Sequence, residues 1–232
     1  MLEVIAETVA DAVAAEAGGA DRIELVAALS EGGLTPSVGM AAIIIEAVRI
    51  PVHVMIRPHS RSFCYDQGDL LAMVSDMDAL RRVGAHGFVL GALEASKDID
   101  KAAMRLLMKA ADGLPVTFHR AIDDTPDLEA SLKELTEFKE VNRVLSSGGK
   151  PDVRTAMKEV VQLREAAKRY GIVFMPGSGL AIESIIPFVR ATGVDEIHMG
   201  TGVRERDEQG RSFVSASKVA VAKANLIAAK AE

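Results

Sequence analysis

Eight short apolar runs, each ending in a polar or glycine-rich stretch, most constrain the fold of this chain. The runs span residues 2–6, 22–26, 52–56, 87–90, 116–119, 143–147, 172–176 and 196–200. Segments with helical spacing of apolar and charged residues cover 10–17, 38–48, 70–83, 101–111, 128–138, 153–170, 182–192 and 214–229. This alternation predicts an α/β fold, a single (β/α)8 barrel of the TIM type. In such barrels the binding groups lie on the loops that follow the strands.

Length and charge agree with one barrel. The chain has 232 residues, close to the about 250 typical of this fold, so we expect a single domain over residues 1–232. A net charge of −6 without a basic cluster disfavours nucleic acid as a partner. No apolar run approaches the roughly 18 residues of a membrane span. The lone Cys64 and the lack of a basic and apolar leader before residue 2 predict a cytoplasmic protein without an internal disulfide.

The strand face that carries charges is predicted to point into the barrel, because the other face packs on helices. The inward residues are Glu3, Ile5, Glu7, Arg22, Glu24, Val26, His53, Met55, Arg57, Thr117, His119, Arg143, Leu145, Ser147, Glu196, His198 and Gly200. The deep charges among them should form an ion-pair network, since an unpaired buried charge is costly. They are Glu3, Arg22, Glu24, Arg143 and Glu196. His53 is expected to be a core histidine.

Side chains at the carboxyl ends of the strands should surround the barrel mouth, and we expect Arg57 and His119 to face a ligand there. In an enzyme, His119 would be the general acid or base, because imidazole titrates near neutral pH. Asp123 or Glu7 would orient it or share the proton. Arg57 would clamp a carboxylate or phosphate. Lysine occupies none of the strand ends, which disfavours Schiff-base chemistry.

Glycine-rich loops predict an anion site at the same mouth. Loops after strands seven and eight commonly bind phosphate through backbone N–H groups, which small residues leave accessible. The candidate residues are Ser146, Ser147, Gly148, Gly149, Gly177, Ser178, Gly179, His198, Gly200, Thr201 and Gly202. The alternative is that these glycines only turn the chain from strand to helix.

Several ordered segments resemble the CutC family, which is linked to copper homeostasis. They are ADRIEL (20–25), LSEGGLTPS (29–37), MIRP (55–58), FCY (63–65), GAL (91–93), TFHRAID (117–123), LSSGG (145–149) and EIH (196–198). The resemblance covers essentially the whole chain and implies a TIM barrel, in agreement with the periodicity.

The resemblance also implies copper, and here the sequence departs from the family. Members linked to copper carry cysteines that would fall at Ile5 and Val26. Cu(I) prefers thiolate and thioether ligands, so two aliphatic residues remove the natural site. Cys64 matches the family and is the remaining candidate metal ligand. Additional donors could come from Met55, Met175, Met199, His119 and His198.

Two functions therefore stay open at this point. The first is a copper homeostasis protein that binds a copper ion. The second is a TIM-barrel enzyme of the proton-transfer or lyase type that acts on a small anionic metabolite, such as a phosphorylated one. A homodimer is an assembly that both functions allow.

Overall fold

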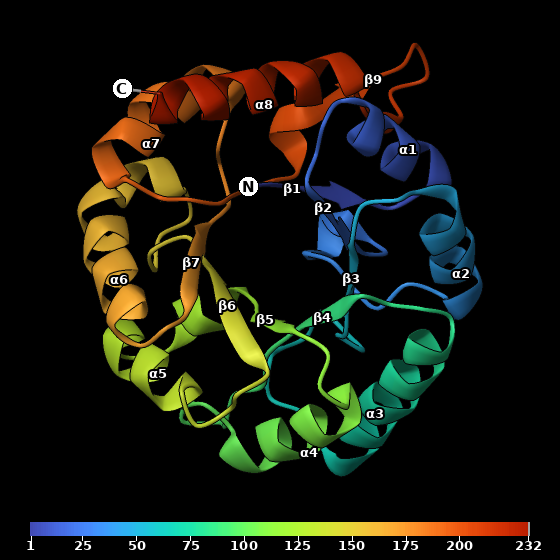
Figure 1. Cartoon of the computed structure of the whole chain (residues 1–232). Helices are drawn as coiled ribbons and strands as arrows, with labels where there is room; N and C mark the ends of the chain where they lie inside the picture. The colour runs from blue at the N-terminus through green and yellow to red at the C-terminus, as the bar shows by residue number, and fades with distance from the viewer. Residues whose placement is uncertain (232) are drawn as a thin grey trace.

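The computed structural model describes residues 1–231, in which eight parallel strands form a barrel inside a ring of eight α-helices (Figure 1). The barrel strands are β1 (Leu2–Ala6), β2 (Arg22–Leu25), β3 (Val52–Met55), β4 (Gly87–Leu90), β5 (Val116–Phe118), β6 (Val141–Ser146), β7 (Val173–Pro176) and β8 (Ile197–Met199). The helices are α1 (Val9–Ala17), α2 (Val38–Ala47), α3 (Gln67–Arg82), α4 (Lys101–Ala111), α5 (Leu128–Leu135), α6 (Met157–Arg169), α7 (Ile185–Thr192) and α8 (Ala216–Lys230). The predicted TIM barrel is confirmed.

The helices begin and end within a few residues of the predicted positions. The largest difference is at α6, which begins at Met157 rather than at residue 153, because Val153–Thr155 forms a separate 3-10 helix. Helix α3 begins at Gln67 rather than at residue 70, because the Asp66 side chain caps it by accepting a hydrogen bond from the Asp69 backbone N–H. None of the helices within residues 1–231 is both long and apolar enough to cross a membrane.

The order of hydrogen-bonded strands runs from β7 through β6, β5, β4, β3, β2 and β1 to β8. Strands β7 and β8 are therefore the two ends of this order. The register places Glu3 beside both Arg22 and His198, and Glu24 beside His53. Polar side chains that point inward consequently meet at the same height in the barrel.

The inside of the barrel has a small apolar layer above the charged one. Ile5, Val26, Met55 and Val89 form this layer and are separate from the main core between sheet and helices. Strand β4 contributes Gly87 below it, where a Cβ atom would lie only 2.7 Å from Nε2 of His53. The missing side chain on β4 therefore makes room for a histidine from the neighbouring strand.

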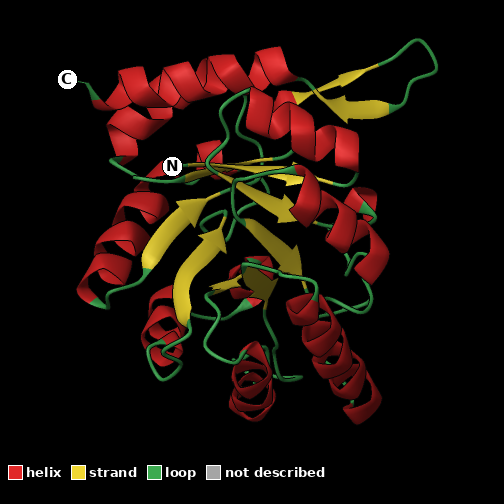
Figure 2. Cartoon of the chain, turned by 45° about the vertical axis from the view of Figure 1, so that its right-hand side comes forward, coloured by secondary structure: helices red, strands yellow, loops and turns green. Residues whose placement is uncertain are grey.

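A hairpin of β9 (Arg204–Arg206) and β10 (Ser212–Val214) follows β8 and projects from the barrel (Figure 2). None of the eight predicted strand runs includes this hairpin, and Val214 of β10 falls in the segment predicted as the last helix. Buried Asp11 in α1 anchors the hairpin, since its carboxylate lies 3.2 Å from Nη2 of Arg204 and accepts the backbone N–H of Val214 at 2.8 Å. Its charged, three-residue strands have no apolar alternation that would predict them.

Candidate functional site

A cavity of about 410 Å³ lies at the carboxyl ends of the barrel strands. It is lined by Ile5, Glu24, Leu29, Glu31, Gly32, Met55, Arg57, Phe63, His119, Arg120, Asp124, Leu145, Ser178, Gly179, Leu180, His198, Gly200 and Thr201. Arg57 and His119, from the ends of β3 and β5, thus share one cavity, as the inward parity predicts. A smaller cavity of about 170 Å³ at the other end of the barrel includes Arg22, His53 and Arg143.

Four deep charges form an ion-pair network beneath the main cavity. Nε of Arg22 lies 2.5 Å from Oε2 of Glu3, and its Nη2 lies 3.3 Å from Oε2 of Glu196. Arg143 binds Glu196 with two hydrogen bonds of 2.6 and 3.0 Å. Burial alone would raise the pKa of Glu3, but Arg22 and a hydrogen bond from His198 outweigh it and hold the pKa far below its ordinary value. The predicted network is confirmed for these four residues.

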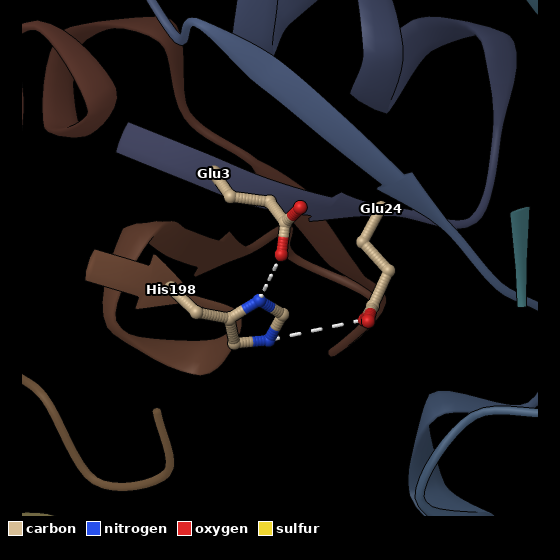
Figure 3. Close-up of side chains that lie close together, drawn as sticks. All are labelled: Glu3, Glu24 and His198. Atoms are coloured by element: carbon tan, nitrogen blue, oxygen red, sulfur yellow. Dashed lines mark hydrogen bonds and ion pairs between the residues drawn. The ribbon is translucent and has the colours of Figure 1, made fainter. Parts of the chain in front are cut away.

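Glu24 is the fifth residue of that prediction, and it differs from the other four. Its Oε1 atom is buried and lacks a hydrogen-bond partner among the described residues, whereas Oε2 lies 3.8 Å from Nε2 of His198 (Figure 3). Burial raises the pKa of Glu24 to about 7, opposed by His198 and aided by Glu3. A carboxyl group with this pKa at a cavity is suited to acid–base chemistry. Sequence reasoning assigned it a structural role.

His198 links Glu24 to Glu3. Its Nδ1 lies 2.7 Å from Oε1 of Glu3, so the imidazole lies between two carboxylates that come from β1 and β2 (Figure 3). Burial alone would lower the pKa of His198, but the charges of Glu24 and Glu3 outweigh it and raise the pKa above its ordinary value. The imidazole of His198 is therefore protonated more easily than an ordinary histidine side chain.

His119 has the opposite electrostatic environment. Its Nδ1 accepts the backbone N–H of Ala121 at 3.2 Å, so the neutral ring carries its proton on Nε2, which has no partner within residues 1–231. Burial and the charge of Arg57 lower the pKa of His119 to about 3. At neutral pH the ring is thus a neutral donor without an acceptor among the described residues of the cavity wall, which disfavours the general acid or base role expected from the sequence.

Arg57 holds two loops in place as well as lining the cavity. Its Nη1 atom donates to the backbone oxygens of Glu31 and Gly33, and Nη2 donates to that of Ser60. The guanidinium also lies 4.6 Å from the centre of the Phe63 ring. Arg57 supplies positive charge at the cavity wall, but its N–H groups are largely committed to the protein.

Asp123 fills the glycine-rich loop that was predicted to bind an external anion. Its carboxylate accepts hydrogen bonds from Oγ of Ser146, from both N and Oγ of Ser147, and from the N–H of Gly149, and it pairs with Arg120. The Gly148 N–H donates to Oγ of Ser146. The donors of Ser146, Ser147 and Gly149 therefore bind the Asp123 carboxylate, an anion that belongs to the protein. The prediction that Asp123 orients His119 is not supported by these contacts.

Glu7 is also committed elsewhere. Its carboxylate accepts the backbone N–H of Leu29 at 2.9 Å and lies 3.5 Å from Nη2 of Arg204. It positions the loop after β2 and contacts the residue that anchors the hairpin. The prediction that it orients His119 is not supported by these contacts.

The loops after β7 and β8 fit the predicted anion site better. Within residues 1–231, no hydrogen bond uses the backbone N–H of Gly179, Gly200 or Thr201, and all three residues line the cavity. Two other donors of the β7 loop are already paired within the protein. The Gly177 N–H donates to the Ser146 carbonyl oxygen, and Oγ of Ser178 donates to the carbonyl oxygen of Pro151.

Gly202, the last residue of the predicted anion site, packs away from the cavity. A Cβ atom at Gly202 would collide with the carbonyl oxygen of Leu180, so the β8 loop packs directly on the β7 loop. The close approach of the two loops brings the unused N–H groups of the β7 and β8 ends to one side of the cavity.

Comparison with known proteins places the chain in a family. Residues 1–203 match the CutC family. The chain belongs to the CutC family. A CutC family protein of Xanthomonas axonopodis pv. citri (strain 306) is 43% identical over 198 residues, which are 85% of this chain and 81% of the relative. The crystal structure of a Streptococcus agalactiae CutC, named for copper homeostasis, superposes with a TM-score of 0.82 at 31% identity and covers 87% of this chain and 98% of that one.

More distant structures share the barrel alone. Phosphoribosyl anthranilate isomerase of Thermotoga maritima superposes with a TM-score of 0.63 at 14% identity, over 98% of each chain. At this identity the likeness shows the fold and no shared chemistry.

The residues of this CutC chain do not fit a Cu(I) thiolate site. Ile5 and Val26, at the positions of the family cysteines, lie in the apolar layer with Met55. Cys64 is exposed on the loop after β3 and does not line the cavity. Met175 accepts a hydrogen bond from buried Arg22 at 3.4 Å. Soft ligands are thus scattered or covered, whereas Cu(I) needs them together.

One group of harder ligands does lie together. Donor atoms of Glu3, Glu24 and His198 lie within 4.8 Å of one another. The imidazole stands between the carboxylates, however, and Glu3 is already paired with Arg22 (Figure 3). This arrangement is a hydrogen bond from His198 to Glu3 and an ion-pair contact from His198 to Glu24, rather than three ligands that converge on one ion.

Proposed function

We propose that this CutC barrel binds a small anionic metabolite in the cavity at the carboxyl ends of its strands and acts on it as an enzyme of the proton-transfer or lyase type. One observation carries the proposal. The β7 and β8 loop residues with unused backbone N–H groups line the same cavity as His119, whose buried Nε2–H has no partner among the described residues.

The physical reason is that donors without acceptors are costly when they are removed from water. An anionic group with several oxygen atoms would accept from the N–H groups of Gly179, Gly200 and Thr201, at the place where TIM barrels commonly bind phosphate. The volume of about 410 Å³ lies within the roughly 300–1,000 Å³ of small-molecule sites. Arg57 and Arg120 line the same cavity and add positive charge.

The acidic lining points to the rest of the ligand. Glu31 and Asp124, which follow β2 and β5, also line the cavity. Carboxylates are strong acceptors, so they would bind hydroxyl groups and repel a second anionic group. We therefore propose a metabolite with one phosphate or carboxylate at the β7–β8 side and hydroxyl groups elsewhere.

Copper homeostasis is the second candidate, and family membership favours it. With Ile5 and Val26 in the apolar layer and Cys64 exposed, we propose that any role in copper homeostasis does not depend on a tight Cu(I) site in this chain. One domain over residues 1–232, a cytoplasmic location and a homodimer are further predictions that accompany this proposal.

The experiment is a titration with inorganic phosphate, followed by calorimetry and by the melting temperature, against sodium chloride of equal ionic strength. Phosphate at ten to a hundred times its dissociation constant should stabilise the parent by about 1.4 to 2.7 kcal/mol. Thr201→Glu places a negative charge at the β8 loop and should abolish the effect, whereas Thr201→Gln has the same size without the charge and should retain most of it.

Gln209→Glu is the control for net charge, because Gln209 is exposed in the turn of the β9–β10 hairpin. It should respond to phosphate as the parent does. A parent that phosphate does not stabilise, or a Thr201→Glu variant that responds as strongly as the parent, would contradict the proposal.

A further inference from the structure

We propose that Glu24 and His198 form an acid–base pair that shares one proton and exchanges it with the bound substrate, and that Glu3 is the residue that positions His198. This inference rests on the proposed function, because it needs a substrate in the same cavity. It adds the group that moves the proton and the class of compound that such a group can act on.

The positions of the three side chains define where the shared proton lies. Oε2 of Glu3 is 2.5 Å from Nε of Arg22, and its Oε1 is 2.7 Å from Nδ1 of His198. Because Glu3 is held as an anion, it accepts a hydrogen bond, and Nδ1 of His198 carries the donated proton. Nε2 of the ring then faces Oε2 of Glu24 at 3.8 Å (Figure 3).

The charges around this pair balance. Glu3 and Glu196 neutralise Arg22 and Arg143 through the contacts described above. His53, beside Glu24 on β3, is neutral because burial lowers its pKa to about 4. Glu24 and His198 therefore add no net charge when they hold one titrating proton between them, whichever of the two carries it.

The pair also borders the ligand cavity. Glu24 and His198 both line the cavity, and Oε1 of Glu24 has no partner among the described residues. His119, whose buried Nε2–H lacks a partner among the described residues, lines the same cavity. A base on β2 and a neutral donor on β5 are suited to a carbonyl compound, because the donor can stabilise the oxygen on which charge develops.

The step that this geometry supports is proton abstraction next to a carbonyl. The Glu24 carboxylate takes the proton, the C–H electron pair forms a C=C bond, and the carbonyl π pair moves to the oxygen that accepts from His119. Return of a proton to the same carbon completes an exchange. Return of the proton to the former carbonyl carbon, while the proton of the neighbouring hydroxyl group passes to the enolate oxygen, completes an isomerisation, and neither outcome needs a redox partner. Lysine is absent from the residues that line the cavity, so an imine is not part of the step. The substrate class is thus a hydroxy-carbonyl compound with one anionic group.

The first test follows His198 by ¹⁵N NMR from pH 5 to pH 9 in the full-length protein. Nδ1 should stay protonated throughout, while Nε2 titrates. Glu24→Gln removes the anion that favours the imidazolium and should lower the His198 midpoint by about one pH unit or more. Glu31→Gln, a change at another cavity carboxylate, should leave it unchanged. An unchanged midpoint in Glu24→Gln would overturn the shared-proton pair.

Glu3→Gln tests the positioning role separately. Without the anionic acceptor, the proton preference for Nδ1 should weaken, and the two ring nitrogen signals should move toward each other. If Glu3→Gln keeps the parent tautomer and the parent titration midpoint of His198, Glu3 does not position the ring. The pairing of Glu24 with His198 is tested separately by Glu24→Gln.

The second test measures deuterium incorporation from D₂O into dihydroxyacetone phosphate by ¹H NMR. The parent should exchange the C–H next to the carbonyl faster than buffer, and Glu24→Gln should be at least about 100-fold slower. Equal rates in parent and Glu24→Gln, or no exchange by the parent, would overturn the catalytic role. Phosphate binding should persist in Glu24→Gln, so loss of exchange with phosphate still bound separates failure of this inference from failure of the proposed function.

Discussion

Replacing Asp123 with asparagine should destabilise the barrel strongly, although the change removes no carbon atom. The carboxylate follows β5 and binds the loop that follows β6, over a sequence separation of 23 to 26 residues. Its side chain is 7% exposed. We expect the variant to lose stability because the loop loses its acceptor, not because a cavity forms.

The magnitude follows from the donors that meet the carboxylate. Oδ1 accepts from Ser146 at 2.6 Å and from Gly149 at 3.0 Å, and Oδ2 accepts from N and Oγ of Ser147, both at 2.9 Å. An asparagine amide turns one of these oxygens into a donor that faces other donors. Leaving a buried donor unsatisfied costs about 1 to 3 kcal/mol, and the remaining bonds lose their charge assistance. We expect a total of roughly 3 kcal/mol, equivalent to a fall in melting temperature of about 6 to 12 °C for a chain of this size.

Urea denaturation followed by circular dichroism measures this difference, with the slope of free energy against urea expected to stay unchanged. Asp124→Asn is the matched control, because Asp124 is the next residue, is exposed and has no side-chain hydrogen bond or ion pair with another residue of the range 1–231. It should change the free energy of unfolding by less than about 0.5 kcal/mol. A loss below about 1 kcal/mol for Asp123→Asn would refute the view that Asp123 holds this loop.

Three further predictions concern other residues. Burial lowers the pKa of His119 from its ordinary 6.5 to about 3. The neutral ring therefore contributes to the free energy of unfolding above pH 6.5, and this contribution is lost as pH falls toward 3. From pH 7 to pH 5 the free energy of unfolding should drop by roughly 2 kcal/mol more in the parent than in His119→Gln. Gly87→Ala puts a Cβ 2.7 Å from Nε2 of His53 and should cost about 1 to 3 kcal/mol, whereas Gly39→Ala, on exposed helix surface with nothing within 4 Å, should gain about 0.5 to 1 kcal/mol. Cu(I) titration should find no tight one-to-one site in the parent or in Cys64→Ser, and a stoichiometric complex lost on that substitution would refute this.

The barrel and the inward faces of its strands could be predicted because they depend on local periodicity. In RIEL, residues 22–25, charged and apolar residues alternate, as expected for a strand with one face on the helices and the other inside the barrel. The same parity correctly placed Arg57 and His119 at one cavity. These features require no knowledge of which distant residues touch.

The details of the site could not be predicted, because they depend on which partners each polar group finds. The sequence of residues 146–149 displays the donors of an anion site, but only the fold shows that Asp123 occupies it. Similarly, the sequence allows Arg22 to pair with Glu3 or with Glu24. It pairs with Glu3, and Oε1 of Glu24 is left without a hydrogen-bond partner among the described residues. The neutral state of His119 depends on its burial and on the charge of Arg57, and the Ala121 N–H at Nδ1 places the ring proton on Nε2.

The most direct measurement of the central claim is a crystal structure grown in selenate, whose anomalous scattering locates a bound tetrahedral anion. We predict an anomalous peak within hydrogen-bonding distance of the backbone N–H groups of Gly179, Gly200 and Thr201, on the side of the cavity where the β7 and β8 loops meet. A peak found only at surface arginines or lysines, with none in this cavity, would contradict it.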